Sequence, residues 1–251
     1  MGNKQMKSSV PAKRPRSRRD PVLEVGSDRS ATRAREDYVK AVYQLGDDGP
    51  VKAADVARHL GVSPVSVSKA KRSLQRDGLL DADEASTNVL RLTRAGRELA
   101  VAMVRRHRLL ETFMHRLLGI PLERVHAEAE RIEHAISEDI AQRLAELMGN
   151  PACDPHGHAI PYSLGEARRS HDPRLTSVSV GTHVLVSSLD DRDAAAVRAL
   201  SEAGVLPGLR AAVLAGDDQR VVLRCGKREV ALSAQHAARV RVVEVPRGRR
   251  A

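Results

Sequence analysis

Histidine and carboxylate side chains recur at helical spacing in the middle of the chain, among residues that are mostly apolar. Side chains three or four positions apart lie on the same face of an α-helix, so two neighbouring helices would each present several of them together. Isolated pairs at this spacing usually belong to a solvated surface, but two such sets side by side favour a divalent metal site. The residues concerned are His107, Glu111, His126, Glu130, Glu133 and His134.

The ligand atoms of this site would be imidazole nitrogens and carboxylate oxygens, because no Cys or Met stands in the set. Sites of this composition favour Mn²⁺ or Fe²⁺ over ions that prefer sulfur, although Zn²⁺ and Co²⁺ still compete for them. Cys153, His156 and His158 form a second candidate group further along the chain. That segment is rich in Pro and Gly, so a linker with incidental histidines is the simpler interpretation.

The segment before these residues has the element order of a winged helix-turn-helix. A short helix over 53–60 ends at a glycine, and a second helix begins with Ser63 as its N-cap and Pro64 at its first position. Two strands over 79–82 and 89–92, joined by a polar loop, would form the wing. Small residues early in the second helix suit entry into the major groove, and basic residues suit phosphate contacts. The residues expected to contact DNA are Ser63, Pro64, Val65, Ser66, Ser68, Lys69 and Arg72.

Beyond the wing, the hydrophobic pattern changes from helical spacing to alternation. Helical spacing continues to about residue 150, a Pro- and Gly-rich segment follows, and alternating stretches such as 221–224 then indicate a small β domain. The expected fold class is mainly α with a small β part. The expected organisation is a disordered basic tail over 1–30, a winged helix-turn-helix domain over 31–98, a helical domain over 99–150, a linker over 151–176 and a β domain over 177–246.

The charge balance favours a polyanionic partner. Lys and Arg together number 42 against 32 for Asp and Glu, a formal net charge of +10, so double-stranded DNA is the first candidate. The two cysteines do not indicate a disulfide framework, and no apolar run is long enough to cross a bilayer. A cytoplasmic protein with no membrane partner is therefore expected.

Two other functions compete with metal-responsive DNA binding. Glu123 and His126 form one Glu-x-x-His pair of the kind used by helical di-metal carboxylate enzymes, which need two such pairs. The chain has no second pair, no nucleophile triad and no Gly-rich phosphate loop, so it offers no case for an enzyme. A winged-helix regulator that responds to a small molecule or a partner instead of a metal stays open as an alternative.

Six segments carry a recognisable combination of motifs. They are EDYVKAVY at 36–43, SPVSVSK at 63–69, QRDGL at 75–79, RHRLLE at 106–111, HAEAERIEH at 126–134 and DPHGHAIP at 154–161. In these segments the chain resembles the diphtheria-toxin-repressor family of metal-dependent bacterial regulators. The resemblance implies a homodimer joined by the helices after the wing, an SH3-like barrel as the β domain, and repression of metal-uptake genes when the metal is abundant.

The resemblance also assigns the metal ligands. Iron-responsive members carry Met and Cys at the positions of Asp37 and Glu130, whereas manganese-responsive members carry Asp and Glu there. Mn²⁺ is therefore the expected cofactor, with Fe²⁺ as the alternative. The family's primary site corresponds to Asp37, Glu130, Glu133 and His134, and its ancillary site to His107, Glu111 and His126.

Two positions depart from the family pattern or extend it. Lys40 stands where two-domain manganese regulators have a second carboxylate, which argues against a closely spaced pair of manganese ions at the primary site. Three-domain members resemble this chain in length, and their barrel can supply a further ligand to the ancillary site. Judged by spacing, Asp193 is the nearest match to that ligand in this chain. A metal joining Asp37 to the helical domain would fix the spacing of the two recognition helices of the dimer.

Overall fold

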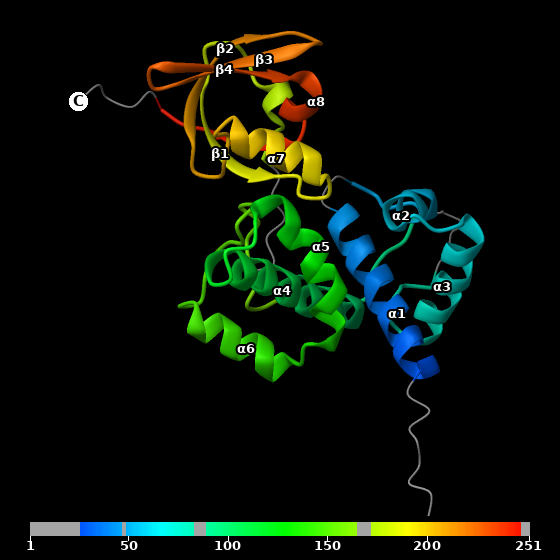
Figure 1. The fold of residues 1–251 in the computed structure, drawn as a ribbon. Coiled ribbons are helices and arrows are strands. Elements are labelled where there is room, and N and C mark those ends of the chain that lie inside the picture. The colour runs from blue at the N-terminus through cyan, green and yellow to red at the C-terminus, as the bar shows by residue number, and fades with distance from the viewer. Residues whose placement is uncertain (1–25, 47–48, 83–88, 165–171, 247–251) are drawn as a thin grey trace, which may run out of the picture.

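The fold, seen in a computed structural model, has three parts that follow one another along the chain (Figure 1). A helical DNA-binding domain comes first, a second helical domain follows, and an antiparallel sheet with short helices closes the chain. This agrees with the expected class, mainly α with a small β part. The structure describes residues 26–46, 49–82, 89–164 and 172–246.

The helix-turn-helix is confirmed in its local chemistry. Gly61 ends α2 in the left-handed conformation, at φ 64°, and the Ser63 hydroxyl accepts a hydrogen bond from the Ser66 amide at the start of α3. The tail prediction is wrong at its end, because α1 begins at Gly26 and continues without a break past residue 30; residues 1–25 lie outside the described part. The three helices of this domain are α1 (Gly26–Leu45), α2 (Ala53–Leu60) and α3 (Pro64–Arg76).

The wing is present as a minimal strand pair. Leu80 and Leu92 form an antiparallel bridge, and the Asp81 amide donates to the Arg91 carbonyl over 2.9 Å. The loop expected over 83–88 lies outside the described residues. Leu80 and Leu92 are buried in the same core as α1 to α3, so the wing is packed onto the DNA-binding domain.

The second domain is built around one long helix, α4, which packs against α1, α5 and α6. Its N-cap is Thr93, and Gly119 at φ 66° ends the turn after it. The sequence placed Glu133 and His134 on the same α-helix as Glu130, but α5 ends at Ile132 and both residues lie in a 3₁₀ turn. The elements are α4 (Arg94–Arg116), α5 (Leu122–Ile132), η1 (Glu133–Ala135) and α6 (Glu138–Leu147).

The C-terminal domain is a five-stranded antiparallel sheet in the order β4-β3-β2-β1-β5. Alternate residues of its strands face one core, and a helix with Asp193 as its N-cap follows β1. The elements are η2 (Leu175–Ser177), β1 (His183–Leu189), α7 (Ala194–Glu202), β2 (Arg210–Gly216), β3 (Arg220–Cys225), β4 (Arg228–Ser233), α8 (Ala234–Ala237) and β5 (Val240–Glu244).

The segment predicted as a linker is packed in its first half. Ile160 joins a core cluster with Leu109 of α4, and His156 is fully buried. Gly157 has φ +91° and lies so close to β1 that an added Cβ would meet the Ser187 carbonyl oxygen at 2.1 Å. The chain therefore needs glycine there, because this loop is wedged between α4 and the sheet domain.

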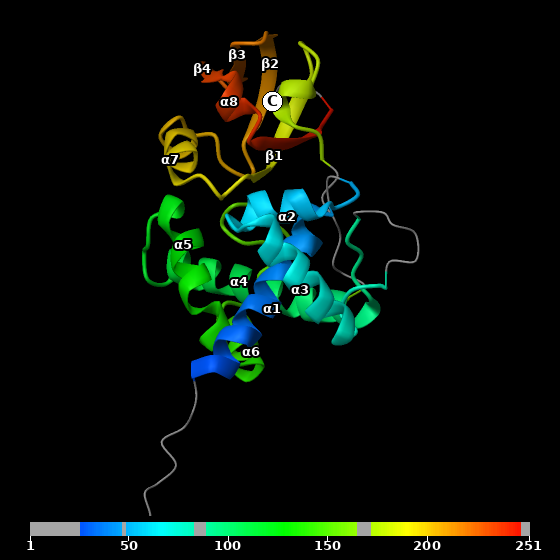
Figure 2. The ribbon, with the colours of Figure 1, turned by 90° about the vertical axis from the view of Figure 1, so that its right-hand side faces the viewer.

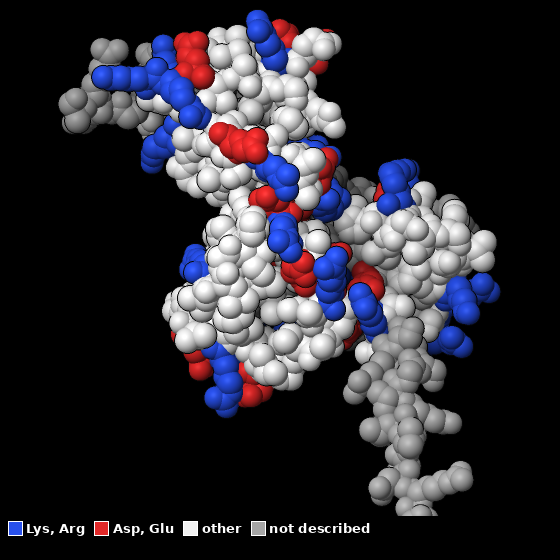
Figure 3. All heavy atoms as spheres, in the orientation of Figure 1, with Lys and Arg blue, Asp and Glu red and all other residues white. Residues whose placement is uncertain are grey.

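The C-terminal domain rests on the other two. Its helix α7 packs against α5, and the rotated view shows the sheet domain above α2 and α5 (Figure 2). Arg192 of this domain lies 3.3 Å from the His59 ring of α2. Acidic and basic side chains interleave along this junction (Figure 3). Within the described ranges, no helix has the length and apolar character to span a bilayer.

Candidate metal centre

The first cluster, formed by Asp37, Glu133 and His134, joins the DNA-binding domain to the helical domain. Their ligand-type atoms all lie within 4.8 Å of one another. His134 Nε2 lies 2.9 Å from Asp37 Oδ1, and His134 Nδ1 lies 2.7 Å from Glu36 Oε2. Since Asp37 and Glu36 lie on α1 and the other two lie in η1, an ion held here would tie the two domains together.

Glu130, assigned to the same site by resemblance, does not converge with these three residues. Its side chain is 54% exposed, and its carboxylate lies 3.7 Å from the Lys40 ammonium. It also lies 3.7 Å from His126 Nε2. Glu130 therefore stands at the rim between the first cluster and its neighbour.

Lys40 occupies the inner side of the first cluster. Its buried ammonium donates to both oxygens of Glu133, at 2.8 and 3.0 Å. The same ammonium lies 3.2 Å from His107 Nδ1. The charge and hydrogen bonds that a metal would offer Glu133 are thus supplied by a lysine within the fold.

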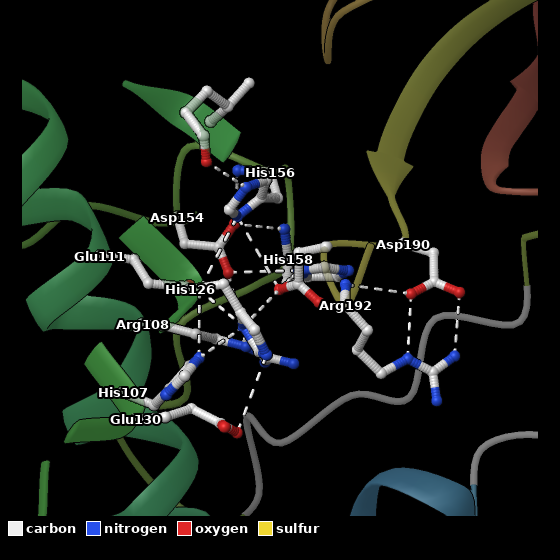
Figure 4. Close-up of polar contacts among 12 residues, drawn as sticks. His107, Arg108, Glu111, His126, Glu130, Asp154, His156, His158, Asp190 and Arg192 are labelled. Carbon is white, nitrogen blue, oxygen red and sulfur yellow. Dashed lines mark hydrogen bonds and ion pairs between the residues drawn. The ribbon is translucent and has the colours of Figure 1, made fainter. Parts of the chain in front are cut away.

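The second cluster consists of His107, Glu111, His126 and Asp191. Glu111 Oε1 lies 3.0 Å from His107 Nε2 and 3.1 Å from His126 Nδ1. Asp191 Oδ2, from the loop after β1, lies 3.5 Å from His126 Nδ1. The three ligands predicted from sequence, His107, Glu111 and His126, are brought together here (Figure 4). The fourth residue, Asp191, comes from the C-terminal domain.

The choice of Asp193 as that fourth residue is wrong. Its side chain caps α7 by accepting hydrogen bonds from the Ala195 and Ala196 amides, and this leaves the position to Asp191 two residues earlier. The sequence signal was the acidic pair 190–191 at the end of a strand, but only the docking of the sheet domain on α5 decides which carboxylate reaches the cluster.

His107 connects the two clusters. A carboxylate only accepts hydrogen bonds, so the 2.5 Å contact between His107 Nδ1 and Glu133 Oε2 places a proton on Nδ1. Nε2 lies 3.0 Å from Glu111 Oε1 and also donates in the metal-free cluster, so it would give up that proton to bind an ion. Outer carboxylates of this kind orient ligating histidines, so Glu133 could serve the first cluster as a ligand and the second as an orienting group.

The pKa shifts in both clusters show that their carboxylates strongly favour a nearby positive charge. Burial opposes protonation of His126, but hydrogen bonds to Asp191 and Glu111 outweigh it and raise its pKa to about 11. Burial likewise opposes protonation of His134, but Asp37 and Glu36 raise its pKa to about 9. Burial would raise the pKa of Glu111, but His107 and His126 hold it far below its usual range. These nitrogen and oxygen ligand atoms, together with the preference for positive charge, are suited to a divalent ion.

The residues expected to contact DNA lie on one exposed face of α3, with Val65 77% exposed. Lys69 and Arg72 are exposed beside it. The serines are partly engaged within the helix, because the Ser63 and Ser66 hydroxyls share a hydrogen bond and Ser68 donates to the Pro64 carbonyl. This face is therefore accessible to a DNA groove, and the first turn of α3 is already held by its own hydrogen bonds.

Comparison with known proteins identifies the family. The chain is 35% identical over 226 residues to the iron-dependent repressor IdeR of Mycobacterium tuberculosis, covering 84% of this chain and 96% of that one. The chain belongs to the diphtheria-toxin-repressor family. A diphtheria toxin repressor from Corynebacterium glutamicum is 31% identical over 223 residues, covering 83% of this chain and 96% of the relative.

The three domains match separate family descriptions. Residues 31–86 match "Iron dependent repressor, N-terminal DNA binding domain", 93–162 match "Iron dependent repressor, metal binding and dimerisation domain", and 174–244 match "FeoA domain". A solved manganese-dependent transcriptional repressor in complex with manganese has a TM-score of 0.78 and 31% identity, covering 84% of this chain and all of that one.

These matches establish the general function of the protein. The protein is a metal-dependent transcriptional repressor of this family, with a helical DNA-binding domain, a dimerisation domain and an SH3-like C-terminal domain. Members of the family are repressors and not enzymes, which removes the di-metal enzyme alternative. Glu123, the acid of that hypothesis, instead pairs with Arg198 of α7 at 3.2 Å.

Metal binding by this repressor should strengthen as the pH rises from 6 to 8. A metal binds the neutral imidazole, while Asp37 and Glu36 keep His134 protonated below a pKa of about 9. Each proton displaced below that pKa should change the affinity by about tenfold per pH unit. Calorimetric Mn²⁺ titrations at several pH values, in buffers of different ionisation enthalpy, would count the protons released, and a pH-independent affinity would contradict the prediction.

The raised pKa of His134 has the opposite consequence for the stability of the metal-free protein, which falls as the pH rises. The folded-state pKa of His134 exceeds the ordinary value of 6.5, so its stabilising ion pairs are fully present below about pH 6.5 and are lost as the pH rises through about 9. Metal and proton therefore stabilise the same cluster in different pH ranges.

Proposed function

We propose that this protein is a manganese-dependent repressor in which metal at the first cluster positions the DNA-binding domain. The observation that carries the proposal is the convergence of Asp37 from α1 with Glu133 and His134 from η1. An ion bound there would replace flexible ion pairs by directed bonds between two domains. Metal and DNA would then favour the same conformation, so each would raise the affinity for the other.

The choice of manganese rests on the ligand types. Asp37, Glu133 and His134 offer only oxygen and imidazole nitrogen, as do the residues of the second cluster, and such sites suit Mn²⁺. The solved relative in complex with manganese has the same overall fold. Fe²⁺ is the second candidate, because the relatives of 35% identity are named iron-dependent.

The repressor is proposed to act as a homodimer on a double-stranded operator. Apolar side chains stay exposed on the helical domain, which matches a dimerisation domain, and a second copy would cover them. Two recognition helices α3 would then meet half-sites about one turn of DNA apart. The exposed apolar residues are Leu117, Leu118, Ile132, Ile140 and Leu147.

The test is DNA binding to the region upstream of the repressor's own coding sequence, by fluorescence anisotropy at fixed salt. Mn²⁺ at micromolar concentration should raise the affinity by about 5- to 150-fold, the usual range of coupling between two sites, and chelation should reverse it. Mg²⁺ serves as the control for a general ionic effect. Stronger activation by anaerobic Fe²⁺ than by Mn²⁺ would favour the iron alternative, and equal binding with and without metal would favour a metal-independent regulator.

A further inference from the structure

The turn after β1 carries two neighbouring residues that contact two different domains. Asp191 lies 3.5 Å from His126 of α5 in the second cluster. The next residue, Arg192, reaches the DNA-binding domain, where one of its guanidinium nitrogens lies 3.3 Å from His59 Nδ1 of α2. Because the Cα atoms of adjacent residues are only about 3.8 Å apart, a shift of Asp191 also shifts Arg192.

Arg192 is fixed in place by its own turn, although its side chain is 54% exposed. Its Nε and Nη2 donate to the two oxygens of Asp190, each over 2.9 Å. The close-up shows this forked pair beside the second cluster (Figure 4). The backbone of Asp190 is held in turn, because its amide donates to the Arg239 carbonyl over 2.8 Å. Paired hydrogen bonds fix the orientation of a guanidinium, so Arg192 moves together with the turn.

His59 is suited to accept the hydrogen bond from Arg192. A guanidinium only donates, so His59 Nδ1 must present a lone pair in this contact. Burial, followed by the charge of Arg192, lowers the pKa of His59. The lowered pKa favours the neutral ring, which has one nitrogen able to accept.

The contact between Arg192 and His59 lies at a cavity between α2 and the sheet domain. The cavity has a volume of about 740 Å³ and is lined by His59 on one side and by Arg192 and Arg239 on the other. On its opposite face, α2 buries Val56 in the same core as Val67 of the recognition helix α3. The position of α2 against the sheet domain therefore also sets the position of α3.

We propose that Arg192 and His59 are positioning residues that transmit metal occupancy of the second cluster to the DNA-binding domain. Asp191 becomes fixed when it ligates an ion, and the turn then holds Arg192 against α2. The first cluster acts on the same domain through Asp37 of α1, so this contact is a second connection made from another domain. The inference rests on the proposed function, because it requires metal and DNA to favour one conformation.

The test is a double-mutant cycle on the full-length chain, made from His59→Leu, Arg192→Met and the double variant. Binding to the same upstream DNA is measured by fluorescence anisotropy, with chelator and with saturating Mn²⁺. The factor by which Mn²⁺ raises the affinity should fall about two- to tenfold in each single variant, as expected for one hydrogen bond. The double variant should lose no more than either single variant, and the affinity in chelator should equal that of the wild type.

Calorimetric titration with Mn²⁺ distinguishes a connecting role from a local one. Coupling between two binding sites is reciprocal, so each variant should bind Mn²⁺ more weakly by the same factor when the DNA is present. Without DNA, each variant should bind Mn²⁺ as tightly as the wild type, which also shows that it is folded. A loss of Mn²⁺ affinity without DNA would mean that Arg192 only supports Asp191 locally, and it would overturn the proposal.

The matched control is Arg198→Met, which removes another exposed arginine at a domain junction. Arg198 lies 3.2 Å from Glu123 of α5, so it joins the sheet domain to the helical domain and not to α2. It should keep full activation by Mn²⁺. Full activation of His59→Leu or Arg192→Met, or additive losses in the double variant, would overturn this inference and leave the proposed function standing. A wild type that Mn²⁺ does not activate would overturn both.

Discussion

Replacing Asp37 with alanine should weaken metal-stimulated DNA binding by about a hundredfold, while leaving the metal-free protein folded. Loss of even an outer-shell partner lowers metal affinity by about 10- to 100-fold, and Asp37 would be a direct ligand from the DNA-binding domain. Its side chain is 37% exposed and pairs with His134, and ion pairs of that exposure contribute little to stability. Fluorescence anisotropy with and without Mn²⁺ measures the effect.

The control for Asp37→Ala is Asp218→Ala, which removes the same charge from an exposed turn of the C-terminal domain. It should retain full activation by metal. The expected pattern for Asp37→Ala is weak binding at every Mn²⁺ concentration, with the affinity of the metal-free state unchanged. Activation of Asp37→Ala by metal equal to that of the wild type would contradict the proposal that the first cluster couples metal binding to DNA binding.

Replacing Lys40 with methionine should destabilise the metal-free protein and make its stability depend on metal. The ammonium donates to both oxygens of the buried Glu133, and removing one partner of a buried pair costs about 3–5 kcal/mol. For a domain of this size that corresponds to a melting temperature lower by about 10 °C. A divalent ion can occupy the vacated position, so Mn²⁺ should restore stability and bind about tenfold more tightly than to the wild type.

Thermal melts monitored by circular dichroism, with chelator and with Mn²⁺, would measure this difference. Lys227→Met, at an exposed turn of the sheet domain, is the matched control and should melt like the wild type in both conditions. An unchanged melting temperature in chelator, or stabilisation by Mn²⁺ no larger than in the wild type, would show that Lys40 is not the internal substitute for the metal.

Local features of this protein could be predicted from the sequence because they depend on neighbours in the chain. The N-cap at Ser63, the left-handed Gly61 and the long helix after Thr93 follow from the chemistry of a few adjacent residues. The pairing of His107 with Glu111 follows from helical spacing alone. Where spacing assumed a continuous α-helix through Glu133 and His134, the prediction was wrong, because α5 ends at Ile132 and both residues lie in a 3₁₀ turn.

The sequence by itself determined the ligand types, the helix-turn-helix and the order of the domains. Only the tertiary structure decided which carboxylate of the sheet domain meets His126, because Asp191 is brought there by the packing of α7 on α5. It also decided that His156 is buried against Glu111 and that Lys40 binds Glu133. These contacts join residues tens of positions apart, and their geometry is set by how helices and sheet pack, which no local pattern encodes.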